Sequence, residues 1–223
     1  MVIAIDGPVG AGKSTAARAL ARRLGYLYVD TGAMYRAVAW RALREGIPLR
    51  DGPRLAALAR RLRIRLVPRG RSLRVLAGSE DVTRAIRRPE TAEASSRVSV
   101  HPGVRRALVA TQRAMGARGG VVMEGRDIGT VVFPRADLKI YLDASPDERA
   151  RRRWDELRAQ RPGASLRAVL GDVTRRDRRD RRRRAAPLRP APGALRLDTT
   201  GLSLRAVIDR LARVARMRAE KRA

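Results

Sequence analysis

The sequence contains no cysteine, which excludes disulfide bonds and cysteine-ligated metal sites. Aromatic residues make up only 3% of the 223 residues, so a core must be built mainly from Leu, Val, Ile and Ala. No apolar run is long enough to span a bilayer, and a predicted strand starts near the first residue, so we expect neither a signal peptide nor a membrane segment. With 44% hydrophobic residues, we expect a cytoplasmic, globular protein with no membrane partner.

Lysine is scarce in a strongly basic sequence. Lys13, Lys139 and Lys221 are the lysines, and all other basic residues except one histidine are arginines; the formal net charge is +29. A basic surface attracts polyanions, including nucleic acid. The arginines are nevertheless scattered along the whole chain, and the aromatic residues that would stack on bases are few. We therefore predict no specific nucleic-acid partner and assign a role to an arginine only where a motif places it.

Five short apolar segments are typical of strands buried in a parallel sheet. They are Val2–Asp6, Tyr26–Asp30, Val121–Gly125, Leu138–Asp143 and Leu195–Thr199. Helical patterns alternate with them, such as Ser14–Leu24 and a last helix with Ser203 as its cap. This alternation predicts an α/β fold with a doubly wound, five-stranded parallel sheet.

Two regions depart from the alternation. Leu62, Ile64 and Leu66 alternate with arginines, and a turn-like PRGRS is followed by a second apolar stretch, LRVLAGS. This predicts an antiparallel hairpin in a small subdomain inserted at about residues 58–98, between core segments 1–57 and 99–223. A second region, at about residues 145–190, is dense in arginine and interrupted by prolines, and we interpret it as irregular.

The stretch GPVGAGKS fits the phosphate-binding pattern G-x-x-x-x-G-K-[ST], between a predicted strand and a predicted helix. The predicted ATP-binding residues are Gly7, Pro8, Val9, Gly10, Ala11, Gly12, Lys13, Ser14 and Thr15. Glycines let backbone N–H groups surround an anion, and the following helix directs its positive end toward it. Lys13 adds a charge at the β- and γ-phosphates, and the Ser14 hydroxyl suits Mg²⁺.

A second set of polar residues follows the second predicted strand, in YVDTGAMYRA. Asp30 ends the strand, Thr31 and Gly32 are predicted to form the turn, and Tyr35 and Arg36 lie in the first turns of the next helix. An arginine at this edge of the sheet can hold a second phosphate with two hydrogen bonds. A surface arginine on an amphipathic helix is the alternative.

The third predicted strand ends in a further group of charges, Glu124, Arg126 and Asp127. Gly125 and Gly129 beside them permit a ligand to approach the backbone closely. Because the carboxyl ends of parallel strands meet at one edge of the sheet, this group predicts an acceptor site beside the ATP site.

Four stretches, in order along the chain, resemble the bacterial cytidylate kinase family: IDGPVGAGKST, DTGAMYRAVAW, EGRDIGTVVFP and RRDRRDRRRRAAPL. The resemblance covers nearly the whole chain, including the inserted region. It implies transfer of the γ-phosphoryl group of ATP to CMP or dCMP, giving CDP or dCDP. It also implies a nucleoside-monophosphate-binding role for the inserted subdomain and an arginine-rich lid at about residues 145–186.

The resemblance also implies roles for single residues. Arg36 and Arg126 match positions that hold the CMP phosphate, Asp127 matches a residue that contacts the ribose, and Ser96 and Arg105 match residues that face the cytosine. The CMP-binding candidates are Thr31, Tyr35, Arg36, Ser96, Arg105, Arg126, Asp127, Asp180 and Arg183, and the catalytic candidates are Lys13, Arg126, Arg176 and Arg183. The spacing of Arg176, Asp180 and Arg183 predicts that they share one helix face.

Two alternatives stay open at this point. The acceptor could be UMP or another small phosphate compound, or the chain could be a nucleic-acid-dependent P-loop ATPase, which the charge of +29 would suit. We expect a monomer that binds ATP with Mg²⁺ and CMP or dCMP.

Overall fold

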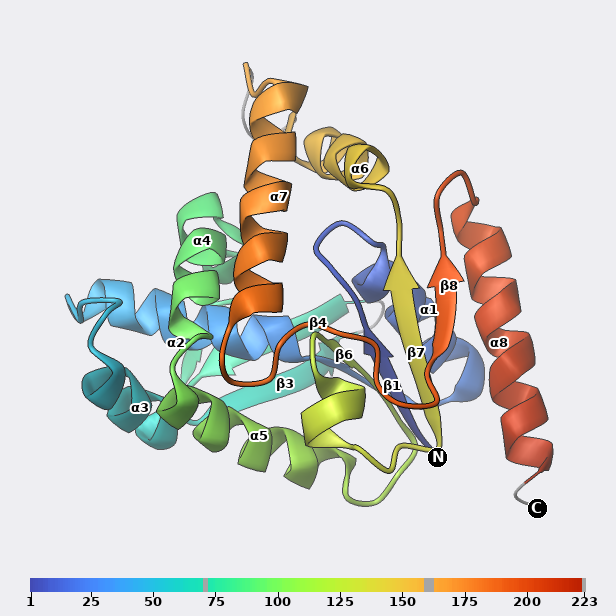
Figure 1. Ribbon diagram of the computed structural model, residues 1–223. Helices are drawn as coiled ribbons and strands as arrows, with labels where there is room; N and C mark the ends of the chain where they lie inside the picture. The colour runs from blue at the N-terminus through green and yellow to red at the C-terminus, as the bar shows by residue number, and fades with distance from the viewer. Residues whose placement is uncertain (70–71, 159–162, 222–223) are drawn as a thin grey trace. The chain divides into compact units, whose positions relative to one another are not determined.

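The computed structural model describes residues 1–69, 72–158 and 163–221 (Figure 1). The chain forms two compact units, one made of Met1–Tyr28 with Arg118–Ala223 and the other of Val29–Ala117. Part of the predicted turn, residues 70–71, and part of the predicted lid, residues 159–162, lie outside the described residues. The subdomain predicted at residues 58–98 falls within the second unit, and its boundaries stay a prediction.

A five-stranded sheet organises the first unit. Its strands are β1 (Val2–Asp6), β2 (Leu27–Asp30), β6 (Val121–Gly125), β7 (Leu138–Asp143) and β8 (Leu195–Asp198), in the order β2-β6-β1-β7-β8. Strand β2 continues past Tyr28 into the first residues of the second unit. β1 pairs in parallel with β6 and β7, and β7 pairs in parallel with β8. The predicted doubly wound α/β class is therefore confirmed, and β1 lies at the centre of the sheet.

Helices cover this sheet, as its apolar strands require. α1 (Lys13–Leu24) follows β1 through the glycine loop, and α8 (Leu204–Glu220) packs against α1. The predicted cap of the last helix is confirmed, because the Ser203 hydroxyl accepts a hydrogen bond from the Ala206 amide over 3.2 Å. A single π-helical turn, Ile128–Val132, follows β6. None of the described helices is both long and apolar enough to cross a membrane.

The arginine-dense region is helical, which corrects the prediction of an irregular segment. α6 (Pro146–Arg158) and α7 (Leu166–Arg182) pack on each other through a small apolar cluster of Ala150, Val169 and Val173. Arginine is a good helix former, so a few apolar residues at helical spacing suffice to pair two arginine-rich helices. α7 ends at Arg182, and Arg183 has an extended backbone, so the predicted common helix face holds for Arg176 and Asp180 only.

The second unit combines helices with a three-stranded sheet. Its helices are α2 (Thr31–Arg44), α3 (Gly52–Arg61), α4 (Pro89–Val98) and α5 (Pro102–Gly116), with a 3-10 turn at Ala85–Arg87. Its strands β3 (Ile64–Arg69), β4 (Ser72–Ala77) and β5 (Glu80–Asp81) pair antiparallel in that order. Residues such as Met34, Leu55 and Leu108 form its apolar core.

The predicted hairpin is present as β3 and β4, but the sequence prediction differs from the structure in two details. Leu62 follows the last turn of α3 instead of starting the strand, so the alternation becomes a strand only from Ile64 onward. The third strand, β5, has only two residues, which is too short to produce a periodic pattern. Thr31 and Gly32 also differ from the prediction, since they open α2 directly and form no separate turn.

Candidate active site

The glycine loop joins the central strand β1 to α1, and each of its glycines has a backbone shape that favours glycine. Gly7, Gly10 and Gly12 have φ values of 150°, 78° and 79°. A Cβ atom on Gly7 would lie 1.9 Å from the Leu142 carbonyl oxygen in β7. This close approach brings the loop against the carboxyl end of β7, where backbone amides can face an anion.

Lys13, the first residue of α1, is buried with 5% of its surface exposed. Its ammonium group donates a hydrogen bond of 2.6 Å to the Pro8 carbonyl oxygen, across the loop. Burial, followed by the nearby charge of Arg126, lowers the pKa of Lys13 from 10.5 to about 7. The loop therefore holds a cation in a place where water compensates its charge poorly, and a bound phosphate would restore that compensation.

Ser14 and Glu124 are joined by a hydrogen bond of 2.6 Å, in which the serine hydroxyl donates to Glu124 Oε1. The Tyr28 hydroxyl donates to the same oxygen over 3.2 Å. Glu124 is buried at the end of β6, directly beside β1. Because the hydroxyl proton goes to Glu124, the lone pairs of the exposed Ser14 oxygen are available to a cation. Thr15 follows in the first turn of α1 and is exposed.

Asp6 ends β1 and supports the segment that carries Asp127. Its two carboxylate oxygens accept hydrogen bonds of 2.8 Å from the amides of Ile128 and Gly129. Burial, partly opposed by these two hydrogen bonds, raises the pKa of Asp6 from 3.8 to about 6. Asp6 is not among the site residues predicted from the sequence.

Three arginines and two carboxylates meet at this edge of the sheet. Arg126 Nε donates to Asp180 Oδ2 over 3.1 Å, and Arg183 Nη2 lies 3.8 Å from Asp127 Oδ1. Burial alone would raise the pKa of Asp180, but the charges of Arg126, Arg176 and Arg183 outweigh it and lower that pKa. The structure thus brings Arg126, Asp127, Arg176, Asp180 and Arg183 close together, and their roles as site residues stay a prediction.

The acceptor candidates Thr31, Tyr35 and Arg36 lie at the start of α2, in the second unit. Asp30 caps this helix by accepting the Ala33 amide over 2.8 Å, and its other oxygen accepts Arg36 Nη2 over 2.8 Å. A Cβ atom on Gly32 would lie 3.1 Å from both Arg36 Nη1 and Asp30 Oδ1, so the glycine makes room for this pair. Asp30 therefore fixes the Arg36 guanidinium.

Ser96 in α4 and Arg105 in α5 are also in the second unit, and both are buried, with 3% and 4% of their surfaces exposed. The guanidinium carbon of Arg105 lies 5.7 Å from the centre of the Tyr35 ring. The Ser96 hydroxyl is buried and has no hydrogen-bond partner among the residues that the structure describes. A buried, unsatisfied hydroxyl is costly, so Ser96 is well suited to meet a ligand.

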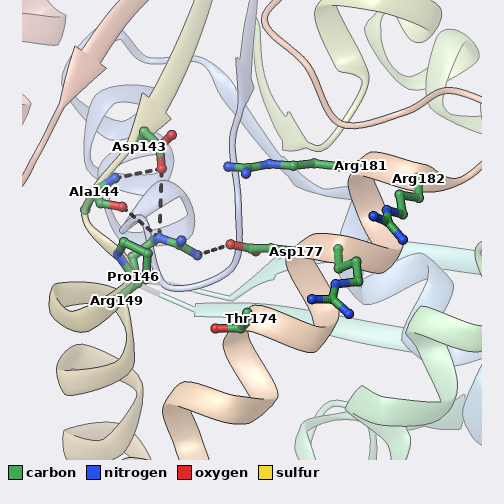
Figure 2. A pocket seen from close by; sticks show the side chains of 9 residues that line it. Asp143, Ala144, Pro146, Arg149, Thr174, Asp177, Arg181 and Arg182 are labelled. Carbon is green, nitrogen blue, oxygen red and sulfur yellow. Dashed lines mark hydrogen bonds and ion pairs between the residues drawn. The ribbon is translucent and has the colours of Figure 1, made fainter.

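Sequence reasoning missed the buried ion pair between Arg149 in α6 and Asp177 in α7, whose atoms Nη1 and Oδ2 are 2.6 Å apart. This pair borders a hollow of about 370 Å³ at the carboxyl end of β7, which Figure 2 shows together with Arg181 and Arg182 of α7. In the sequence, Arg149 looks like any other arginine of a solvated helix, so no local pattern marks it.

A glycine loop of this shape, between the central strand of a parallel sheet and the helix that follows, makes this chain a P-loop protein of the doubly wound α/β class. Comparison with known families narrows the class. The family model for cytidylate kinase matches residues 3–217, and the chain belongs to that family.

Individual relatives agree with this assignment. The chain is 53% identical to the cytidylate kinase of Solibacter usitatus over 98% of its own length and 93% of that protein. It is 52% identical to the cytidylate kinase of Desulfitobacterium hafniense, with 94% and 90% of the two chains covered. It is 50% identical to the cytidylate kinase of an Exiguobacterium strain, with 95% of each chain covered.

Proposed function

We propose that this protein transfers the γ-phosphoryl group of ATP to CMP and dCMP, giving CDP and dCDP. Family membership over residues 3–217 supports the reaction. The observation that carries the proposal is the P-loop lysine, which is buried against the Pro8 carbonyl and whose pKa is lowered to about 7. A cation held in this way is prepared for the phosphates of a nucleotide.

The donor half of the reaction belongs to the glycine loop. Its amides would surround the β-phosphate, and Lys13 would bind between the β- and γ-phosphates. When bound with ATP, Mg²⁺ would neutralise phosphate charge, and Ser14 would hold it through the oxygen left available by its hydrogen bond to Glu124. No group of three or more Asp, Glu, His or Cys side chains fit for a metal occurs among the described residues. Phosphate oxygens of ATP and water would supply the other ligands of the Mg²⁺.

The transfer needs no general base, because the attacking oxygen of CMP is already an anion. As the bond from the γ-phosphorus to its bridging oxygen breaks, a bond to the CMP oxygen forms, and ADP carries away the electron pair. Arg126, Arg176 and Arg183 would stabilise the negative charge on the transferred group, with Asp180 holding Arg126 in position. Asp127 would contact the ribose.

The acceptor half belongs to the second unit. Arg36, held by Asp30, would bind the CMP phosphate beside Thr31 and Tyr35. Ser96 and Arg105 would read the cytosine, whose N3 and O2 accept hydrogen bonds and whose N4 donates. UMP has a carbonyl oxygen in place of the N4 amine, so it would leave an acceptor of the site unpaired, at a cost of about 1–3 kcal/mol. A monomeric state and a cytoplasmic location remain predictions from the sequence.

The test is an ATP- and Mg²⁺-dependent phosphorylation panel over CMP, dCMP, UMP, AMP and dTMP, with Lys13→Ala as the inactive control. We expect CMP and dCMP to be used with the highest kcat/KM and Lys13→Ala to be folded but inactive. If UMP were used with the highest kcat/KM, UMP would replace CMP as the proposed acceptor. ATP hydrolysis that requires added nucleic acid and no mononucleotide would support the P-loop ATPase instead and contradict the proposal.

A further inference from the structure

Arg149 is nearly absent from the surface of a protein whose arginines are mostly exposed. It lies in the first turn of α6, just beyond the carboxyl end of β7, and only 2% of its surface is accessible to solvent. A buried guanidinium is costly unless its donors and its charge are satisfied. The proposed chemistry of the site does not use Arg149, so its burial needs another explanation.

The Arg149 guanidinium connects three parts of the first unit. Its Nε donates to the Ala144 carbonyl after β7 over 2.8 Å, and its Nη1 donates to the Val9 carbonyl in the glycine loop over 3.1 Å. The same Nη1 lies 2.6 Å from Asp177 Oδ2 in α7. Figure 2 shows the side chain pointing from α6 toward α7, between Asp143 and Asp177.

The glycine loop also packs directly against this residue. A Cβ atom on Gly10 would lie 2.7 Å from the Arg149 carbonyl oxygen and 2.9 Å from its Cβ atom, so only glycine fits there. Val9 packs against the apolar cluster that joins α6 and α7. The loop therefore has two fixed contacts with the helix pair, one polar and one apolar, and Arg149 takes part in the polar one.

Asp177 depends on Arg149 for compensation of its charge. Only 7% of its surface is exposed, and within the described parts of the chain its Oδ1 atom has no hydrogen-bond partner. Asp177 follows Arg176 directly and lies three residues before Asp180 in α7. A restraint on Asp177 is therefore a restraint on the turn of helix that carries both of these candidates.

We propose that Arg149 is a positioning residue that links the glycine loop to α7, so that Arg176 and Asp180 are held in register with the phosphates of bound ATP. Lysine could not replace it, because a single ammonium group lacks the planar fork that reaches Ala144, Val9 and Asp177 together. The catalytic consequence rests on the proposed phosphoryl transfer. The link between the glycine loop and α7 can also be tested without phosphoryl transfer, by measuring the affinity for ATP in the absence of CMP.

The main test is Asp177→Asn, which keeps the size of the side chain and removes the charge that pairs with Arg149. We expect kcat for CMP phosphorylation to fall about tenfold, equivalent to ~1.4 kcal/mol, while KM for CMP stays within about twofold. Asp172→Asn is the matched control, because Asp172 pairs with Arg175 on the same helix with both side chains about 70% exposed. It should leave kcat unchanged.

A second variant, Arg149→Lys, reports on the loop. We expect it to lower kcat as Asp177→Asn does and also to weaken ATP binding, measured calorimetrically without CMP, by about five- to tenfold. The double variant should be no worse in kcat than the more impaired single variant, because the two residues act as a unit.

A purely structural ion pair would behave differently. It would lower the melting temperature of Asp177→Asn and leave its kcat within about twofold of wild type at a temperature where the variant is folded, and this result would overturn the proposal. If the wild-type protein used none of the acceptors, the proposed function would fail, and ATP binding would still decide the role of Arg149. Equal ATP affinity in wild type and Arg149→Lys would then contradict the proposed positioning role of Arg149.

Discussion

Lys13 illustrates how much of this site is determined at single residues. A lysine that donates to one carbonyl and stands near Arg126 is destabilised as a cation, and its pKa falls to about 7. The ammonium form becomes favourable again when phosphate oxygens arrive. The empty protein is therefore expected to carry this group partly neutral at physiological pH, and ATP is expected to change its protonation.

We predict that ATP binding takes up a proton at pH 8. The pKa of free Lys13 is about 7, so the group is mostly neutral at pH 8, and the bound phosphates raise that pKa. At pH 8 the γ-phosphate is already ionised, since its pKa is about 6, so it does not contribute. Calorimetric titrations in buffers of different ionisation enthalpy should show an uptake of up to about one proton at pH 8, and Lys13 should contribute almost none of the proton exchange at pH 6.

Lys13→Ala should lose this uptake while still giving a folded protein. If the variant and the wild type took up the same number of protons, another group would be responsible and the low pKa assigned to Lys13 would be wrong.

Arg105 carries the second prediction at this scale. Its burial in the second unit, with its guanidinium near the Tyr35 ring, distinguishes it from the solvated arginines of the surface. If it reads cytosine, Arg105→Ala should lower kcat/KM for CMP by about 1–3 kcal/mol, roughly five- to 150-fold, and affect UMP less. Steady-state kinetics with both nucleotides measures the change in the ratio.

Arg106→Ala is the matched control, because Arg106 is the next residue of the same helix and is exposed. It should leave the ratio of CMP to UMP use unchanged. An unchanged ratio in Arg105→Ala as well would remove Arg105 from the base-reading site.

The limits of sequence reasoning are visible in these residues. The glycine loop could be located from sequence alone, because its glycines, lysine and serine are contiguous and each has a local reason. Asp6, Arg149 and Asp177 could not, because their partners come from other elements and their residue types are common on surfaces. A buried ion pair of this kind is defined by packing, and no spacing along the chain encodes it.

At the scale of elements, the accuracy with which strands and helices could be predicted depended on the strength of their apolar pattern. β1, β6 and β7 were predicted with their observed ends, since a strand buried on both faces is a continuous apolar run that a polar residue or glycine closes. α6 and the part of α7 before Arg176 were missed because three small apolar residues, Ala150, Val169 and Val173, form the core between the two helices. The surrounding arginines gave no helical period, although they favour a helix by propensity.

The junction of β1 with the glycine loop supplies a prediction at this scale. Gly7→Ala would place a methyl group 1.9 Å from the Leu142 carbonyl oxygen, at a φ of +150°. The parallel strands β1 and β7 would have to separate to make room for this methyl group. We expect a loss of about 3 kcal/mol or more in the free energy of unfolding, measured by urea denaturation.

Gly25→Ala is the reference for backbone strain alone. Gly25 caps the C-terminal end of α1 with a φ of +66°, and apart from its chain neighbours no atom of the described residues lies within 4 Å of an added Cβ, so the expected loss is about 1–2 kcal/mol. Equal losses in the two variants would show that the close approach of the loop to β7 has no energetic weight.

For the whole molecule, the dominant quantity is the excess of 51 basic over 22 acidic residues. Many carboxylates are paired, as in the exposed contacts of Arg44 with Glu80 and Arg74 with Asp81. Exposed pairs of this kind contribute little, and the remaining positive charges repel one another. Repulsion between exposed charges is sensitive to salt, because the electrostatic screening length shortens from about 30 Å at 0.01 M salt to about 3 Å at 1 M salt.

We therefore predict that sodium chloride stabilises the protein. Raising its concentration from 0.02 to 0.5 M should increase stability by about 1–2 kcal/mol, or roughly 3–6 °C in melting temperature for a chain of this size. Lys13→Ala should show the same gain, because general screening does not depend on the glycine loop. If the gain disappeared in that variant, anion binding at the loop would be its source, and a gain in neither protein would contradict the prediction.

The division into two units has a consequence for synthesis on the ribosome. β1 is the central strand of its sheet, yet both of its neighbours, β6 and β7, come after the whole of Val29–Ala117. At about 5–20 residues per second, roughly 6–23 s pass between the appearance of Asp6 and that of Val121. During that time the second unit can assemble a core made of its own residues, while β1 has no strand beside it. The phosphate-binding loop, although encoded near the start of the sequence, would then be among the last parts of the protein to acquire its shape.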